Sequence, residues 1–149
     1  MWPIAVDAEL VRPLRAEVLR PGQSQEQLTF PGDDAADTLH AAVRIDGRIV
    51  GVASVMREPH PHDPLPGDWR VRGMATSVEM RGRGVGGALL ARCEEHVRDQ
   101  GGARLWCNAR VRARTFYERA GFAVEGEAFE VPAIGPHYLM CKPLHPLGG

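Results

Sequence analysis

The chain has 149 residues, of which 44% are hydrophobic, and a formal net charge of −1 at pH 7. A chain of this length and apolar content can bury the core of one domain, so we expect a single domain over residues 1–149. The balanced charge gives no electrostatic reason to expect a nucleic acid or a membrane surface as partner. No apolar run approaches the ~18 residues of a membrane span.

The N-terminal residues and the cysteines predict a cytoplasmic protein. Residues 1–7 lack the basic and apolar regions of a secretory signal peptide. Cys93, Cys107 and Cys141 are odd in number and scattered, which favours reduced, mostly buried thiols. No Cys or His spacing indicates a zinc site. His60-Pro61-His62-Asp63 could bind a metal, but its Pro-rich setting is typical of a flexible loop, so we expect no bound metal.

The chain is predicted to begin with a short strand at residues 2–6 and a helix at about residues 8–19. Asp7 can cap the start of this helix, and Pro13 is expected to interrupt or kink it. Pro21-Gly22 is expected to end it.

A β-hairpin and a loop follow. Two apolar-rich segments, residues 40–45 and 48–56, flank Asp46-Gly47, which is a strong hairpin turn signal. Residues 58–68 contain four prolines and are predicted to form a loop.

The second half of the chain alternates strands and helices. Leu89, Leu90, Cys93 and Val97 recur at helical spacing, which predicts a helix over about residues 84–100. The other predicted elements are strands at residues 69–76, 104–109, 122–130 and 137–141 and a helix at residues 112–120. Strands that first meander and then alternate with helices indicate an α/β (α+β) fold, with a mixed sheet and helices on its faces.

Residues 81–90 are the most informative stretch, because four glycines occur within six residues at the start of a helix. These are Gly82, Gly84, Gly86 and Gly87. Glycine lets the backbone turn tightly and approach a ligand closely. The first N–H groups of a helix lack intrahelical partners, and no Ser, Thr, Asp or Asn is present here to cap them. The loop therefore predicts an anion site.

One reading of this loop is a nucleotide-binding module of the Rossmann type. Gly82, Gly84 and Gly87 match the spacing of the dinucleotide fingerprint. However, residues 77–81 separate the loop from the preceding strand, and the next strand ends in Trp-Cys-Asn at residues 106–108, with no acid to hold a ribose. These departures make the Rossmann interpretation the weaker one.

The loop more closely resembles the acetyl-CoA motif of the GNAT N-acetyltransferases, Gln/Arg-x-x-Gly-x-Gly/Ala, which reads Arg-Gly-Arg-Gly-Val-Gly at residues 81–86. A second family signature follows, since Asn108 closes a strand and residues 113–122 resemble the helix with the pattern Phe-Tyr-x-x-x-Gly-Phe. The resemblance covers about residues 69–124. It implies the GNAT fold, with a mostly antiparallel sheet of about seven strands and helices on both faces.

The resemblance also implies how acetyl-CoA is held. Backbone N–H groups of the glycine loop would hold the pyrophosphate, and Arg81 or Arg83 would neutralise phosphate charge. The implied loop residues are Arg81, Gly82, Arg83, Gly84, Val85, Gly86 and Gly87.

Two strands are expected to hold the rest of acetyl-CoA. In the family the strand that carries Met74, Ala75 and Thr76 splays from its neighbour, takes the pantetheine arm and polarises the thioester carbonyl. Gly73 is expected to ease that splay. Asn108 is expected to hydrogen-bond the pantetheine arm.

For the chemistry, the resemblance implies an enzyme that transfers an acetyl group from acetyl-CoA to a primary amine by direct attack. Tyr117 would donate a proton or hydrogen bond to the leaving thiolate, while its neighbour Phe116 fits the core better. His137 is the favoured general base, because a histidine can accept a proton near neutral pH. Glu127, Glu130 or solvent remain alternatives for that role.

The acceptor is expected to be a small-molecule or peptide amine. Its pocket would be built from residues 20–37, 57–68 and 125–137, which match no specific subfamily. A non-catalytic acyl-CoA sensor that kept the cofactor loop is an alternative to an enzyme. A monomer and a homodimer are equally compatible with the sequence.

Overall fold

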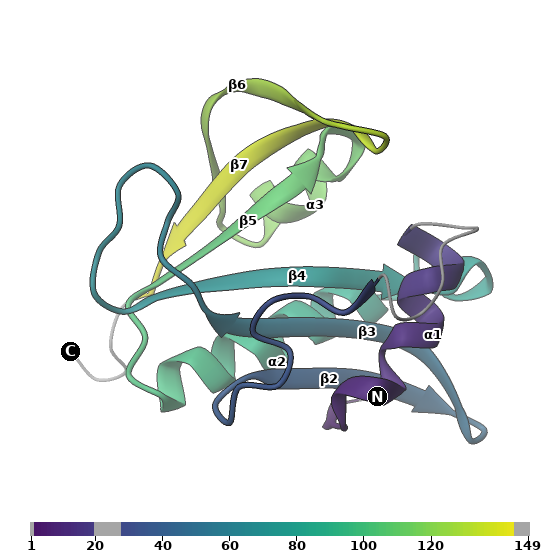
Figure 1. Ribbon diagram of the computed structural model, residues 1–149. Coiled ribbons are helices and arrows are strands. Elements are labelled where there is room, and N and C mark those ends of the chain that lie inside the picture. The colour runs from purple at the N-terminus through teal and green to yellow at the C-terminus, as the bar shows by residue number, and fades with distance from the viewer. Residues whose placement is uncertain (1, 20–27, 145–149) are drawn as a thin grey trace.

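The computed structural model describes residues 2–19 and 28–144 (Figure 1). Its strands form one sheet in the order β1-β2-β3-β4-β5-β7-β6. Neighbouring strands are antiparallel except β4 and β5, which are parallel. The predicted fold, a mostly antiparallel mixed sheet of about seven strands, is therefore confirmed.

The elements have the following bounds. The strands are β1 Ile4–Ala5, β2 Leu39–Ile45, β3 Arg48–Arg57, β4 Asp68–Thr76, β5 Arg104–Arg110, β6 Ala123–Val131 and β7 Gly135–Pro143. The helical elements are η1 Ala8–Leu10, α1 Arg12–Leu14, η2 Arg15–Leu19, η4 Val78–Met80, α2 Val85–Asp99, η5 Val111–Ala113 and α3 Arg114–Arg119. No helix among the described residues is long and apolar enough to cross a membrane.

The N-terminal helical segment differs from its prediction in detail. It consists of a 3-10 turn, a short α-helix and a π-helix instead of one helix. Asp7 occupies the N-cap position of η1, but its side chain makes no capping hydrogen bond, so the predicted cap is wrong. Pro13 lies in the first turn of α1, where its missing N–H costs nothing. The predicted end at Pro21-Gly22 falls outside the described residues.

The predicted hairpin is confirmed, and its turn explains the register of β2 and β3. Asp46 and Gly47 have φ angles of 50° and 77°, the left-handed conformations that a two-residue hairpin turn requires. Arg44 then pairs with Ile49 and Ile45 with Arg48.

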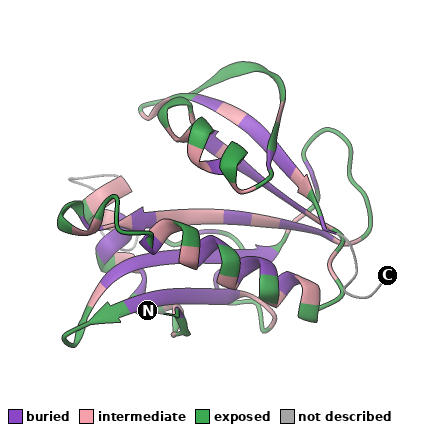
Figure 2. Ribbon diagram, turned by 180° about the vertical axis from the view of Figure 1, so that it is seen from behind, coloured by how far each residue is buried: buried purple, intermediate pink, exposed green. Residues whose placement is uncertain are grey.

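Helices cover both faces of the sheet, as predicted. α2 packs against β2, β3 and β4, and α1 and η2 lie on the opposite face against β3 and β4 (Figure 1). The predicted apolar stripe of α2 is buried against the sheet, as Figure 2 shows from behind. Its residues Leu89, Leu90, Cys93 and Val97 join the main core. The three cysteines are free and buried, as predicted.

The sheet opens between β4 and β5. These strands pair only from Asp68–Arg70 to Arg104–Trp106, after which β5, β7 and β6 swing away from β4 (Figure 1). A bulge in β4 marks the divergence, because the β3–β4 register shifts between Val52 and Ser54. Gly73 lies in this bulge with φ +67°, a conformation that favours glycine. The predicted splay at Gly73 is confirmed.

Candidate active site

A groove follows the glycine loop and the free edge of β4. We call it the loop groove; its lining includes Met74, Ala75, Thr76, Arg81, Gly82, Gly84, Val85, Gly86 and Gly87, with Arg110, Arg112, Phe116 and Arg119 opposite. From Val71 to Thr76, no strand among the described residues pairs with the edge of β4 that faces β5. Main-chain donors and acceptors on that edge are therefore available to a ligand.

The start of α2 is uncapped, as predicted. Its N-cap residue Gly84 has φ +81° and makes no side-chain capping bond. The first intrahelical bond runs from the N–H of Ala88 to the carbonyl of Gly84 at 3.1 Å. The N–H groups that precede Ala88 in the helix have no intrahelical acceptor and can bind an anion. The positive end of the helix dipole lies at the same place and also favours an anion.

The glycines of the loop serve different purposes. Gly82 and Gly84 adopt positive φ angles, which other residues rarely do. A Cβ on Gly86 would lie 3.2 Å from Cε1 of Phe116, so this glycine allows α2 and α3 to pack closely. A Cβ on Gly87 would meet no atom within 4 Å. Packing of the protein therefore does not require a glycine at position 87, which borders the loop groove.

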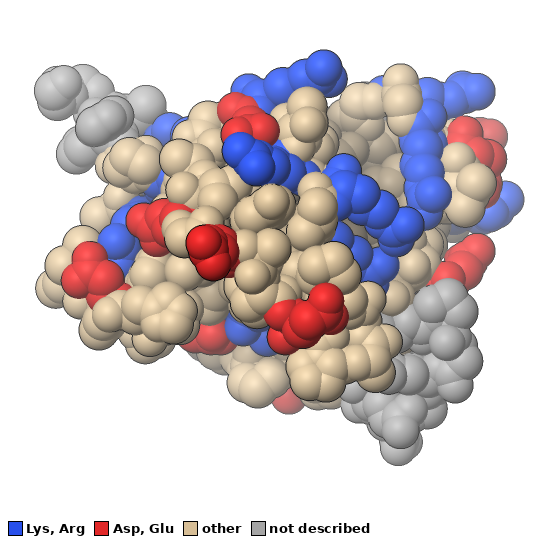
Figure 3. Space-filling view, turned by 90° about the horizontal axis from the view of Figure 1, so that it is seen from above, with Lys and Arg blue, Asp and Glu red and all other residues tan. Residues whose placement is uncertain are grey.

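Positive charge surrounds the loop groove. Arg81 lines it, whereas Arg83 is exposed and does not. Arg110, Arg112 and Arg119 also line it, and sequence analysis missed all three. Figure 3 shows Lys and Arg side chains gathered toward the upper right of the face seen from above. This charge complements the phosphate groups of a nucleotide-like ligand.

The loop groove continues into a second hollow between the diverging strands, which we call the inner cavity. The two share Leu19, Met74, Arg110, Arg112, Ala113 and Phe116. Asn108, Tyr117 and His137 line the inner cavity but not the loop groove. The structure thus brings the predicted catalytic residues to the inner end of the predicted cofactor site.

Tyr117 is the more buried of the two adjacent aromatic residues on α3. It is 7% exposed and belongs to the core, whereas Phe116 is half-buried and lines both hollows. The prediction that Phe116 fits the core better than Tyr117 is therefore wrong. Both rings border the cavity, and Tyr117 also packs edge-on against Phe116 and Phe122.

The phenol of Tyr117 is held in its neutral form. Burial, with smaller contributions from Cys107 and Cys93, raises the pKa of Tyr117 well above its ordinary value of 10.0. Its hydroxyl makes no hydrogen bond within residues 2–19 and 28–144. A neutral phenol that borders a cavity is a hydrogen-bond donor for a ligand placed there.

His137 lies near the start of β7 and is 7% exposed. The carbonyl of Gly135 lies 2.9 Å from its Nδ1. Because a carbonyl can only accept, Nδ1 carries the hydrogen, and Nε2 of the neutral ring keeps a lone pair. Glu127 and Glu130 are exposed on β6 and line neither hollow, so His137 is the one of the three predicted bases that borders the cavity.

The walls of the acceptor region match the predicted segments only in part. Phe30, Val131, Ile134 and His137 come from the predicted ranges 20–37 and 125–137, although residues 20–27 lie outside the described part. No residue of 57–68 lines the inner cavity. Arg70 and Arg72 of β4 line it instead, and no sequence signal pointed to them.

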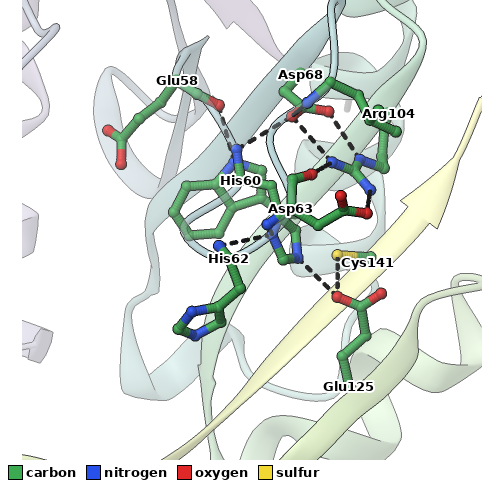
Figure 4. Close-up of polar contacts among 10 residues, drawn as sticks. Glu58, His60, His62, Asp63, Asp68, Arg104, Glu125 and Cys141 are labelled. Carbon is green, nitrogen blue, oxygen red and sulfur yellow. Dashed lines mark hydrogen bonds and ion pairs between the residues drawn. The ribbon is translucent and has the colours of Figure 1, made fainter.

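The loop at residues 58–67 serves a structural role on another part of the sheet (Figure 4). His60 is 4% exposed, and its Nδ1 accepts the backbone N–H groups of His62 and Asp63. Its Nε2–H therefore donates to Glu125, at 2.7 Å. The loop is more constrained than its proline content predicted.

The same hydrogen bonds bear on metal binding. Ligand atoms of His60, Glu125 and Cys141 lie within 4.8 Å of one another. However, the tautomer of His60 leaves no lone pair on Nε2, the atom that faces the other two groups. The cluster suits a hydrogen-bonded clamp better than a metal centre.

The three thiols are poor nucleophiles. Burial raises the pKa of Cys93 to about 12, and burial together with the hydrogen bond to Glu125 raises that of Cys141 to about 12. Burial also raises the pKa of Cys107 well above its ordinary value. Because the thiolate is the reactive form, these residues do not favour a covalent acyl-enzyme.

Comparison with known proteins identifies the family. A family model described as "Acetyltransferase (GNAT) domain" matches residues 8–137. The chain is 34% identical over 131 residues to the uncharacterized N-acetyltransferase YitI of Bacillus subtilis, and the match covers 88% of each chain.

Solved structures share the fold. Escherichia coli ElaA superposes with a TM-score of 0.74 at 21% identity, covering 89% of this chain and 87% of the other. An aminoglycoside 6'-N-acetyltransferase complexed with coenzyme A superposes with a TM-score of 0.73 at 13% identity, covering 98% of each chain. These similarities and the mostly antiparallel sheet exclude the Rossmann interpretation. The chain belongs to the GNAT acetyltransferase family and is an acyltransferase enzyme.

Proposed function

We propose that this enzyme transfers an acetyl group from acetyl-CoA to a primary amine, and that the amine attacks the thioester directly. The observation that carries the proposal is one continuous path. It runs from the uncapped start of α2, along the unpaired edge of β4, to Tyr117 and His137 in the inner cavity. The fold relative solved with coenzyme A supports the choice of cofactor.

The loop groove accounts for binding of the phosphate end. The N–H groups at the start of α2 would bind the pyrophosphate, and Arg81 with Arg119 would balance its charge. The pantetheine arm would lie against the open edge of β4, with Asn108 at its inner end. Main-chain hydrogen bonds from this edge would place the thioester carbonyl and polarise it.

At the thioester, the amine lone pair forms the new C–N bond and the C–S bond breaks, so the leaving group is a thiolate. This thiolate would take up, directly or through solvent, the proton that the nitrogen loses as the amide forms. Tyr117 is suited to stabilise the thiolate by donating a hydrogen bond. An ordinary thiol has a pKa of ~8.5, whereas the pKa of Tyr117 is raised above 10.0. The phenol therefore holds its proton more tightly than the thiol does, and Tyr117 would act through a hydrogen bond without complete proton transfer.

The acceptor must lose a proton before it can attack, because an alkylamine is protonated near neutral pH. Nε2 of His137 would accept this proton, directly or through one water molecule, while Nδ1–H stays bonded to the carbonyl of Gly135. Glu127 and Glu130 do not border the cavity, which supports His137 over them. No step in this scheme requires a metal ion.

Release of free thiol from acetyl-CoA, measured with pooled primary amines, tests the proposal. We expect amine-dependent release and an acetylated product with the mass of the amine plus one acetyl group. Tight acetyl-CoA binding without turnover on a broad panel would instead support the acyl-CoA sensor. An acetylated protein intermediate found by mass spectrometry would contradict direct attack.

A further inference from the structure

The imidazole ring of His137 has a neighbour on each side in the sheet. β7, which carries it, lies between β5 and β6, and β6 ends the described sheet (Figure 1). The antiparallel ladders place Arg110 of β5 opposite His137 on one side and Phe129 of β6 opposite it on the other. Residues that lie opposite one another in a ladder project from the same face. The side chain of Phe129 is therefore next to the imidazole ring, toward the edge of the sheet.

The rings of Phe129 and His137 lie against one another. Their centroids are 6.1 Å apart and their planes are inclined by 33°, which is within the range of aromatic pairs in contact. His137 is 7% exposed, whereas Phe129 is 37% exposed and lines neither hollow. Phe129 thus lies between the imidazole ring and solvent at the edge of the sheet.

A bulge in β6 brings Phe129 to this position. Glu125 pairs with Leu139, which lies two residues beyond His137 on β7. An unbroken antiparallel ladder would then place Glu127 opposite His137. The register instead shifts between Glu125 and Phe129, so β6 has two extra residues in this interval and Phe129 takes the place of Glu127. Bulges re-aim side chains in this way next to active sites.

The exchange of a carboxylate for a phenyl ring suits a histidine that must keep a lone pair. A carboxylate beside an imidazole ring accepts a hydrogen bond from it or pairs with its protonated form, and would compete with an acceptor amine for the ring. A phenyl ring offers no such partner. Nε2 of His137 is then left for the cavity, while Nδ1–H donates to the carbonyl of Gly135.

We propose that Phe129 is a positioning residue for the general base: it holds the imidazole ring of His137 in place and shields its outer side from solvent. The inference rests on the proposed acetyl transfer, in which Nε2 of His137 accepts the proton of the amine. Phe129 borders neither hollow, so it acts through His137. A ring held in one orientation keeps Nε2 within reach of the amine, and a small displacement of a reacting group can lower the rate by about 100-fold.

Carbethoxylation by diethyl pyrocarbonate tests the shielding without any substrate. The reagent modifies neutral imidazole nitrogens, and peptide mass spectrometry gives the rate at each histidine. We expect His137 to react about threefold faster or more in Phe129→Ala than in the wild type, because its cover is lost. Phe129→Tyr keeps the ring, so there His137 should react as in the wild type. His62, which is exposed, is the internal reference.

Kinetics test whether Phe129 acts through His137. Phe129→Ala should lower kcat/KM by about tenfold or more, mainly through kcat, and leave the Kd for acetyl-CoA unchanged. Phe129→Tyr should keep turnover. In the His137→Gln background, Phe129→Ala should cause little further loss, because the group on which it acts is absent. Ile45→Ala is the control, since Ile45 is 36% exposed on β2, four strands away from β7 in the sheet, and its loss should change neither measurement.

An unchanged rate of carbethoxylation at His137 in folded Phe129→Ala would overturn this inference. Multiplicative losses in the double variant would also overturn it, because they would show a general effect on the fold. Either result would leave acetyl transfer intact. Phe129→Leu, which loses the flat ring but keeps an apolar side chain, is a second variant with the same expected direction of change. Absence of wild-type turnover with every amine would overturn the proposed function and the role of a base with it, and the carbethoxylation rates separate that case because they require no turnover.

Discussion

Arg110 on β5 and His137 on β7 are directly opposite one another in the antiparallel ladder. Their side chains therefore leave the same face of the sheet, and both border the inner cavity. The imidazole ring of His137 is oriented by its hydrogen bond to the carbonyl of Gly135, which lies at the same end of β7. The sheet register thus places a potential base next to a permanent cation, at the point where β4 and β5 have separated.

Replacement of His137 tests its role as base. We expect His137→Gln to lower kcat/KM by about 100-fold and to alter the dependence of kcat/KM on pH, because the variant cannot accept a proton. The profile should be compared for two amines of different pKa, because the amine also titrates. An inflection that follows the amine and persists in the variant would exclude His137 as base. A role in positioning alone would raise KM and keep the pH profile.

The hydroxyl of Tyr117 can be removed without disturbing the ring. We expect Tyr117→Phe to lower kcat by about 100-fold while the Kd for acetyl-CoA changes little. Stability should be nearly unchanged, because the hydroxyl has no hydrogen-bond partner among the described residues and the ring contacts with Phe116 and Phe122 are kept. Phe122→Leu is a packing control: it should reduce stability, with a smaller effect on kcat. Wild-type turnover in Tyr117→Phe would assign the residue to the core alone.

Gly87 offers a direct test of the phosphate site. A side chain there meets no protein atom within 4 Å and lines the loop groove. We expect Gly87→Val to weaken acetyl-CoA binding by about tenfold or more, through loss of one or two charge-assisted hydrogen bonds. Calorimetric titration gives the Kd. At Gly86 the same change would also press on Phe116, so a loss of binding there has two causes.

Gly101→Ser is a control for the Gly87 experiment because Gly101, just beyond the C-terminal end of α2, is exposed and far along the chain from the loop. Its positive φ predicts some loss of stability without loss of affinity. An unchanged Kd in folded Gly87→Val would contradict the assignment of the phosphate site.

Local signals account for the parts of the fold and site that the sequence predicted well. The Asp46-Gly47 turn, the stripe of α2 and the glycine loop each depend on residues close together in the chain. The glycine loop could be assigned a ligand because its chemistry is carried by the backbone, whose direction is set by the helix start.

Side-chain surroundings set by distant segments could not be predicted. Arg72 borders the cavity because β5 separates from β4 after Arg70. The resemblance predicted a splay at Gly73, but it did not indicate which side chains would line the opening. The prediction for α3 also gave the wrong order of burial for Phe116 and Tyr117. Both of these adjacent side chains border the cavity, so their positions on the helix did not show which one is more buried. His60 is ordered by Glu125, a partner 65 positions away in the sequence.

The buried ion pair between Arg15 and Asp33 predicts a large loss of stability when it is broken. Two hydrogen bonds of 2.7 and 3.1 Å join these fully buried side chains, and Asp33 also accepts the N–H of Phe30. We expect Asp33→Asn to cost about 3–5 kcal/mol in free energy of unfolding, because Arg15 is left as an uncompensated buried charge. Urea denaturation provides the measurement. A loss below about 1 kcal/mol would show that the pair contributes little.

Asp68 predicts how stability depends on pH. Burial opposes its ionisation, but the hydrogen bond from Arg104 and the N–H groups of Leu65 and His60 outweigh that cost, so the pKa of Asp68 lies below its ordinary value of 3.8. A carboxyl group whose pKa is lowered on folding stabilises the folded state above its unfolded pKa. That contribution should be complete at neutral pH and should disappear as the pH falls below about 3.8 and through the lowered pKa.

Asp68→Asn isolates this effect. At pH 7 we expect it to lower the free energy of unfolding by about 1–3 kcal/mol, because the bond to Arg104 loses its charge assistance and the two N–H groups lose acceptor strength. The difference from wild type should shrink as the pH falls from 5 toward 3, since protonation removes the same charge from Asp68. Asp34→Asn, which removes an exposed carboxylate, controls for the substitution itself. A difference between wild type and Asp68→Asn that stays constant down to pH 3 would show that the side chain acts through its shape and hydrogen bonds, and that its charge does not stabilise the fold.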